Sequence, residues 1–93
     1  MISTMIMSRI KINPYITFNT IETNVIVLNE HGSRIFQLDD ISSEIWDLIA
    51  NGMDIDEIVE KMKMKYQGDD KIMRRDIEDL INKLIEENLL ICE

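Results

Sequence analysis

The spacing of apolar residues changes at Asp40, and this change is the strongest constraint on what the chain can fold into. Before it, residues 15–38 contain short runs rich in β-branched and aromatic residues, which are typical of β-strands. After it, apolar residues recur at steps of three and four, the spacing of amphipathic helices. Strands followed by helices within 93 residues predict one α+β domain, covering residues 1–93, with one core.

Three short strands are expected in the first part of the chain. The first covers residues 15–20 behind Pro14, which is tolerated where an edge strand begins. The second, residues 25–28, is continuously apolar, as expected of a central strand covered on both faces. The third covers residues 34–38, after a turn that contains Gly32. Two consecutive hairpins predict a three-stranded antiparallel sheet, with the unpaired backbone groups of a free edge on the third strand.

Three helices are expected in residues 40–88. The first has Asp40, Ser42 or Ser43 as its N-cap and ends at residues 51–52, where Asn-Gly is typical of a helix end. The expected apolar stripes of the three helices are, in chain order, Ile41, Ile45, Leu48 and Ile49; Ile55, Ile58, Val59, Met62 and Tyr66; and Met73, Ile77, Leu80, Ile81 and Leu84.

The second helix begins after Asp54, and Glu57 completes a capping box with it. The third helix covers residues 71–88 and has the most regular pattern of the three. We expect the apolar residues 89–92 to lie extended against the body of the domain, and residues 1–8 are a candidate disordered tail. The order of elements favours a winged-helix-like arrangement, with the three-stranded sheet followed by three helices.

No group of residues has the pattern of an active site or a metal site. His31 is the only histidine, and Cys92, the only cysteine, lacks a histidine to activate it. The Asp-Asp pairs at 39–40 and 69–70 each precede a predicted helix, where Asp caps free N–H groups. We therefore predict no catalytic residue, no metal and no cofactor, and we do not expect an enzyme.

The cysteine content and the hydropathy indicate a compartment. A single cysteine, too few for a disulfide within the chain, fits a reducing cytoplasm. No window approaches the ~20 consecutive apolar residues that a membrane helix needs. The sequence therefore predicts a cytoplasmic protein with no membrane partner.

Short stretches along most of the chain together resemble the PqqD family, the recognition elements of pathways that modify ribosomally made peptides. Their order and spacing carry the resemblance. The stretches are Val27-Leu28-Asn29, Phe36-Gln37-Leu38-Asp39, Ile45-Trp46-Asp47-Leu48 with Gly52, Ile55, Ile58-Val59, Tyr66, Arg75-Asp76-Ile77, Leu80, Leu84 and Asn88-Leu89-Leu90. Two positions depart from the family pattern: Asn88 replaces a frequent glycine and Ile77 a frequent valine. Asn tolerates the left-handed cap that glycine supplies.

The resemblance implies a domain that binds the leader segment of a precursor peptide and brings it to a modifying enzyme, such as a radical SAM enzyme or a lasso-type protease/cyclase. It also implies that the leader adds as a strand to the third strand, in a groove with the third helix. The implied peptide-binding residues are Ser33, Arg34, Ile35, Phe36, Gln37 and Leu38 on the strand, and Met73, Asp76, Ile77, Leu80 and Lys83 on the helix. For Phe36, Leu38, Ile77 and Leu80, plain core packing is an equal alternative.

Two other functions stay open at this point. A winged-helix regulator would place the third helix, with Arg74 and Arg75, in a DNA groove. Residues 39–93 carry 7 basic and 16 acidic side chains of a chain with net charge -8, so a nucleic acid partner is not expected. The remaining alternative is a small structural subunit of an enzyme complex.

Overall fold

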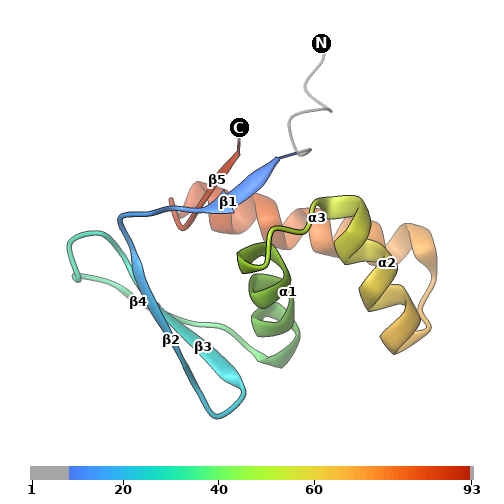
Figure 1. Cartoon of the computed structure of the whole chain (residues 1–93), viewed down its shortest axis with the longest axis horizontal. Coiled ribbons are helices and arrows are strands. Elements are labelled where there is room, and N and C mark those ends of the chain that lie inside the picture. Colours follow the sequence, from blue (N-terminus) through green and yellow to red (C-terminus); the bar gives the residue numbers. More distant parts are fainter. Residues whose placement is uncertain (1–8, 93) are drawn as a thin grey trace.

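The computed structural model describes residues 9–92, so the candidate tail at residues 1–8 lies outside the described part of the chain. A three-stranded sheet projects to one side of three helices, and two further strands from the two ends of the chain lie together (Figure 1). The elements are β1 (Ile10–Ile12), β2 (Thr17–Ile21), β3 (Asn24–Leu28), β4 (Ile35–Gln37), α1 (Asp40–Ala50), α2 (Ile55–Tyr66), α3 (Asp70–Glu86) and β5 (Leu90–Cys92).

The three-stranded sheet has the order β2-β3-β4 and is antiparallel, which confirms the predicted meander and its central strand. A two-residue turn joins β2 to β3, and Glu22 in that turn has a φ of 59°. The prediction that β3 is covered on both faces is wrong. Val25 and Val27 are fully buried, whereas Ile26 and Leu28 are partly exposed, because the helices cover one face of the sheet only.

Local side-chain chemistry sets the helix starts. The capping box of Asp54 and Glu57 at α2 is present as predicted. The N-cap of α1 is Asp39, which corrects the expectation of Asp40, Ser42 or Ser43. Asp39 is the last extended residue, with ψ of -179°, and its carboxylate accepts from the N–H of Ser42, whereas Asp40 is already helical.

The ends of the described chain meet in a pairing that the sequence analysis did not predict. Residues 90–92 form β5, extended as expected, and pair with β1 in the register Ile10↔Cys92. Asn13 ties this pair together, because its Nδ2 donates to the carbonyl of Asn88 at 2.8 Å and its N–H donates to that of Leu89 at 3.1 Å. Asn88 has a φ of 63°, the left-handed conformation expected of it.

The core lies between the inner face of the sheet and the three helices. Trp46 is fully buried there, and Phe18 of β2 meets its ring edge-on at 5.3 Å between ring centroids. Most of the predicted helix stripes are buried or partly buried. Ile41 and Tyr66 are exceptions, at 43% and 44% exposed, so their assignment to core stripes is wrong. Within residues 9–92, no helix is long and apolar enough to cross a membrane.

Candidate functional site

The sheet has two edges, β2 and β4; the sequence analysis expected the first strand at an edge and assigned the free edge to the third strand. In an antiparallel ladder, alternate residues exchange backbone hydrogen bonds with the neighbouring strand. The N–H of Leu38 donates to the carbonyl of Val25, and the N–H of Asn29 donates to that of Arg34. Phe36 therefore bonds to β3, while the N–H and C=O groups of Ile35 and Gln37 face away from the sheet.

The β2 edge is partly closed by one of its own side chains. By the same alternation, Phe18 and Thr20 carry the outward backbone groups of β2. The N–H of Thr20 donates to Oδ1 of Asn19 at 2.9 Å. No such bond occupies Ile35 or Gln37 within residues 9–92, so β4 is the more open edge.

Side chains of β4 divide between the two faces of the sheet. Phe36 points toward the helices and is half-buried, with the Arg34 guanidinium 4.8 Å from its ring centroid. Leu38, next along the chain, is buried. Ile35 points to the uncovered face and is 69% exposed. The strand thus offers backbone groups at its edge and one aromatic side chain toward the helices.

Two pockets lie at opposite ends of the space between β4 and α3. The apolar pocket, about 430 Å³, begins at Asp39 just after β4 and continues between α1, α2 and the N-terminal half of α3. The polar pocket, about 320 Å³, lies between the start of β4 and the C-terminal end of α3. Arg34 and Glu87, which both line the polar pocket, form an ion pair at 3.0 Å.

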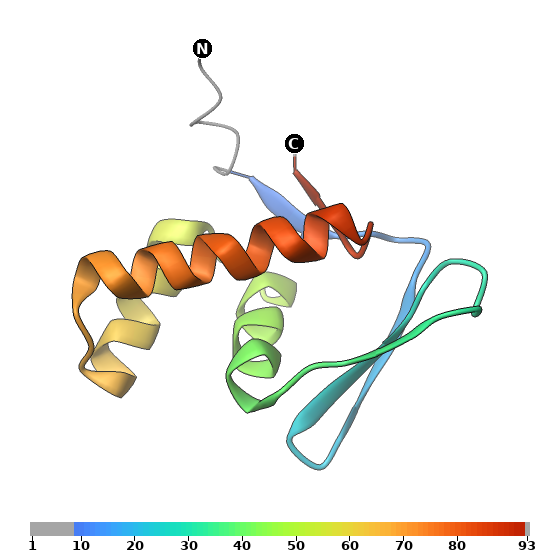
Figure 2. The same cartoon turned by 180° about the vertical axis from the view of Figure 1, so that it is seen from behind.

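One row of α3 connects the two pockets. Asp76 and Leu80 line the apolar pocket, and Glu87 lines the polar pocket. Steps of four, three and four residues lead from Asp76 through Leu80 and Lys83 to Glu87, so these side chains share one face of the helix. Figure 2 shows α3 lying across α1, with its C-terminal end toward the loop that precedes β4.

The structure brings most of the predicted site residues to this space. Met73, Asp76, Ile77 and Leu80 line the apolar pocket, and Ile77 is itself buried. Arg34 and Phe36 line the polar pocket, and Lys83, on the connecting row, lines neither. Ser33 instead lies in the turn before β4, where its N–H donates to Oδ1 of Asn29.

Several residues that the sequence analysis did not assign to the site line the apolar pocket. They are Asp39, Ile41, Ser42, Ile45, Met62, Tyr66, Gly68, Asp69 and Ile72. The sequence pattern did single out Ile41 and Tyr66, because they lie at the ends of predicted apolar stripes. Helical spacing, however, does not distinguish a core position from the mouth of a pocket. Ile72, at 62% exposed, lies outside every predicted stripe.

A polar cluster next to the apolar pocket joins α1 to α2. The Glu44 carboxylate accepts from the Lys65 ammonium and from the Tyr66 hydroxyl, so the Tyr66 ring is held at the pocket. The hydrogen bond from Lys65, followed by that from Tyr66, lowers the pKa of Glu44. The same Glu44 contacts raise the pKa of Lys65 and of Tyr66. Near the end of β4, hydrogen bonds from Ser42, the backbone N–H first, lower the pKa of Asp39.

This arrangement defines a class: a winged-helix-like α+β domain with an open sheet edge facing its third helix. Within that class, the chain belongs to the PqqD family, because residues 24–90 match the family model described as coenzyme PQQ synthesis protein D. Comparison with curated proteins gives no match.

Two solved structures are similar to the chain. The first is TbiB1 in complex with the TbiA(beta) leader peptide, with 30% identity and a TM-score of 0.82, covering 86% of this chain and 93% of TbiB1. The second is a lasso peptide synthetase B1 complexed with the leader peptide, with 18% identity and a TM-score of 0.82, covering 90% of this chain and 99% of that one. The second likeness concerns the fold alone. The predicted fold class is therefore confirmed.

Proposed function

We propose that this chain binds the leader segment of a ribosomally synthesised precursor peptide and brings it to a modifying enzyme. The observation that carries the proposal is the open edge of β4, where Ile35 and Gln37 present backbone groups between the two pockets. An extended peptide gains affinity from such backbone groups and specificity from flanking pockets. TbiB1, 30% identical to this chain, was solved with a leader peptide.

The length of α3 over which the two pockets extend sets the length of the guest. From Met73 to Glu87, α3 rises about 21 Å at ~1.5 Å per residue. An extended peptide covers that distance with about six residues at ~3.3 Å each. The site therefore fits a short extended segment, bounded by side chains that enter the apolar pocket at one end and the polar pocket at the other.

The chain's role in this proposal is to bind. Among residues 9–92, no group of three His, Cys, Asp or Glu side chains is placed to hold a metal. His31 lines the polar pocket, whereas Cys92 lies in β5 and lines neither pocket. The modifying enzyme, either a radical SAM enzyme or a protease/cyclase, is the expected second partner. Co-purification with the enzyme encoded beside this gene tests that partnership.

Calorimetric titration and amide NMR test leader binding. The probe is the leader of a precursor peptide encoded beside this gene. We expect saturable binding in the micromolar range or tighter, at ~8 kcal/mol or more, with amide shifts at Ile35 and Gln37 and smaller ones at Phe18 on the β2 edge. No heat and no shift at Ile35 and Gln37 would overturn the proposal.

A charge reversal on the helix side probes the site without touching the core. Lys83 is exposed on the row that connects the pockets, and Lys83→Glu is expected to change leader affinity with an unchanged unfolding midpoint. The matched control is Lys61→Glu, at an exposed lysine of α2 that lines neither the apolar nor the polar pocket. Equal affinities for the two variants would contradict the placement of the leader beside α3.

A further inference from the structure

The mouth of the apolar pocket holds exposed apolar side chains. Ile41, Tyr66 and Ile72 come from three different helices, are 43%, 44% and 62% exposed, and all line this pocket. Single exposed apolar residues are ordinary, but several gathered around one opening are typical of a surface that another molecule covers. The volume of about 430 Å³ is within the range of ~300–1,000 Å³ usual for ligand sites.

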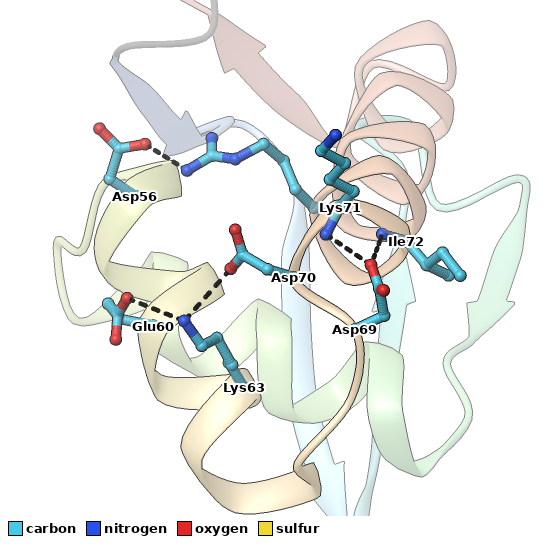
Figure 3. A network of polar contacts seen from close by, with 8 residues as sticks. Asp56, Glu60, Lys63, Asp69, Asp70, Lys71 and Ile72 are labelled. Atoms are coloured by element: carbon cyan, nitrogen blue, oxygen red, sulfur yellow. Dashed lines mark hydrogen bonds and ion pairs between the residues drawn. The ribbon is translucent and has the colours of Figure 1, made fainter.

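The charge around this opening is of one sign. Asp39, Asp69 and Asp76 line the pocket, and among the described residues 9–92 no lysine, arginine or histidine lines it. Two nearby cations, Lys63 and Arg74, pair with carboxylates that do not line the pocket, and Figure 3 shows the contact of Lys63 with Asp70. Lys63 lies 3.5 Å from Asp70, and Arg74 lies 2.8 Å from Asp56.

The three carboxylates of the pocket differ in how their charge is balanced. Asp39 and Asp69 are N-caps that accept backbone N–H groups, and the helix N-termini match part of their charge. Asp76 lies in the second turn of α3 and has no hydrogen bond or ion pair with any residue of the described range 9–92. The attraction for a cation is therefore concentrated at Asp76.

We propose that the apolar pocket takes a large apolar side chain of the leader, and that a basic residue next to it lies against Asp76. This inference rests on the proposed function, and it adds the chemical class of the segment that is recognised. The pocket begins at Asp39, two residues after β4 ends, so a strand paired with Ile35 and Gln37 leads into it. A lysine or arginine suits this position because its aliphatic stem covers Ile72 while its charge reaches the carboxylate.

The test uses the full chain and the leader encoded beside the gene, with each Lys and Arg of the leader changed to Gln in turn. We expect Asp76→Asn to weaken binding about three-fold at low salt, as for an exposed ion pair, and less at high salt. For one of these leaders, the change to Gln should weaken binding to the wild type by the same factor. The same leader should bind Asp76→Asn as tightly as the unchanged leader does, as expected from a double-mutant cycle.

Two further variants complete the test. Asp79→Asn, an exposed carboxylate of the same helix that does not line the pocket, should leave the affinity unchanged. Ile72→Ser, at a side chain 62% exposed, should weaken binding while the unfolding midpoint stays the same. Unchanged or tighter binding by Asp76→Asn, with amide shifts still present at Ile35 and Gln37, would overturn this inference and leave the proposed function standing. Absence of those shifts and of any heat would overturn the proposed function itself.

Discussion

Ser43 joins the sheet to the first helix through one hydroxyl group. It is 2% exposed, and its Oγ accepts from the N–H of Val25 at 2.8 Å and donates to the carbonyl of Leu38 at 3.3 Å. The hydroxyl therefore completes the ladder where β4 gives way to α1, next to the apolar pocket.

Removing that hydroxyl leaves a buried N–H group without a partner. We expect Ser43→Ala to lower the free energy of unfolding by about 1–3 kcal/mol, measured by urea denaturation. Ser33→Ala is the matched control, because Ser33 is exposed, and we expect a change within ~0.5 kcal/mol. Equal losses in the two variants would contradict the role of Ser43.

Asn88 offers a second test at a single residue. With a φ of 63°, it takes the left-handed conformation that ends α3. Asn88→Ala should lower the free energy of unfolding by ~1–2 kcal/mol, because Cβ crowds the backbone there, whereas Asn88→Gly should keep or raise it. The hydrogen bond from Asn13 goes to the backbone carbonyl of residue 88 and survives both changes. Thermal unfolding of the two variants checks this prediction. A Gly variant that is less stable than the Ala variant would contradict it.

Residue-level predictions from the sequence succeeded where chemistry is local. The capping box of Asp54 and Glu57 and the left-handed Asn88 are confirmed, because each depends on a few neighbouring residues. The cap of α1 was expected at Asp40, Ser42 or Ser43 and is Asp39, because several neighbouring residues there have side chains that can cap a helix. Ile41 and Tyr66 were assigned to the core, but both are exposed. Helical spacing identifies an apolar face and does not show whether that face packs within the domain or against another molecule.

At the scale of elements, β4 gives a test that separates the edge from the fold. The N–H of Ile35 faces away from β3, whereas the N–H of Phe36 bonds to it. Ile35→Pro should therefore keep the fold and weaken leader binding, because proline is tolerated at the edge of a sheet but removes the donor. Phe36→Pro breaks the ladder and should destabilise the domain.

Circular dichroism, urea denaturation and calorimetric titration of both proline variants check this prediction. An Ile35→Pro variant that is folded and binds the leader as the wild type does would show that the guest does not use the outward groups of β4. Ile35→Ala is the control for the loss of the side chain, which lies on the uncovered face of the sheet.

The elements that the sequence predicted have a local signal. The helices α1, α2 and α3 have a helical period, β3 lies in a continuous apolar run, and turns separate β2, β3 and β4. The strands β1 and β5 have three residues each and pair across the length of the described chain, so neither periodicity nor a local turn indicates them. The first strand was expected at an edge of the sheet, but the free edge was assigned to the third strand alone, because only the assembled sheet shows which outward backbone groups are covered.

For the molecule as a whole, the distribution of charge argues against the DNA-binding alternative. The net charge is -8, and Arg74, one of the two adjacent arginines of α3, is already held by Asp56 at 2.8 Å and lies 3.9 Å from Glu78. The charged side chains of the α3 row that connects the two pockets are Asp76, Lys83 and Glu87. Both features favour a peptide partner over the phosphates of a nucleic acid.

Stability of the whole domain should depend on pH through the cluster that holds α2 against α1. Because hydrogen bonds lower the pKa of Glu44, its contribution is complete above its pKa in the unfolded chain and is lost as the pH falls through the lower folded value. Lys65 and Tyr66 have raised pKa values, so their contributions are complete below their unfolded values and are lost as the pH rises through the folded ones. The cluster therefore stabilises the domain between about pH 5 and pH 9.

Glu44→Gln removes the charge while keeping a side chain of similar size. We expect its melting temperature to lie below that of the wild type at pH 7, and the difference to shrink between about pH 5 and pH 3, as Glu44 of the wild type becomes protonated. Glu60→Gln is the control, because Glu60 is exposed and, within residues 9–92, its one ion pair is a 3.8 Å contact with Lys63. Because Glu44 also positions Tyr66 at the apolar pocket, the affinity for the leader should fall over the same acid range in the wild type and less in Glu44→Gln. A difference in melting temperature that stays constant from pH 7 to pH 3 would rule out the titration of Glu44 as its cause.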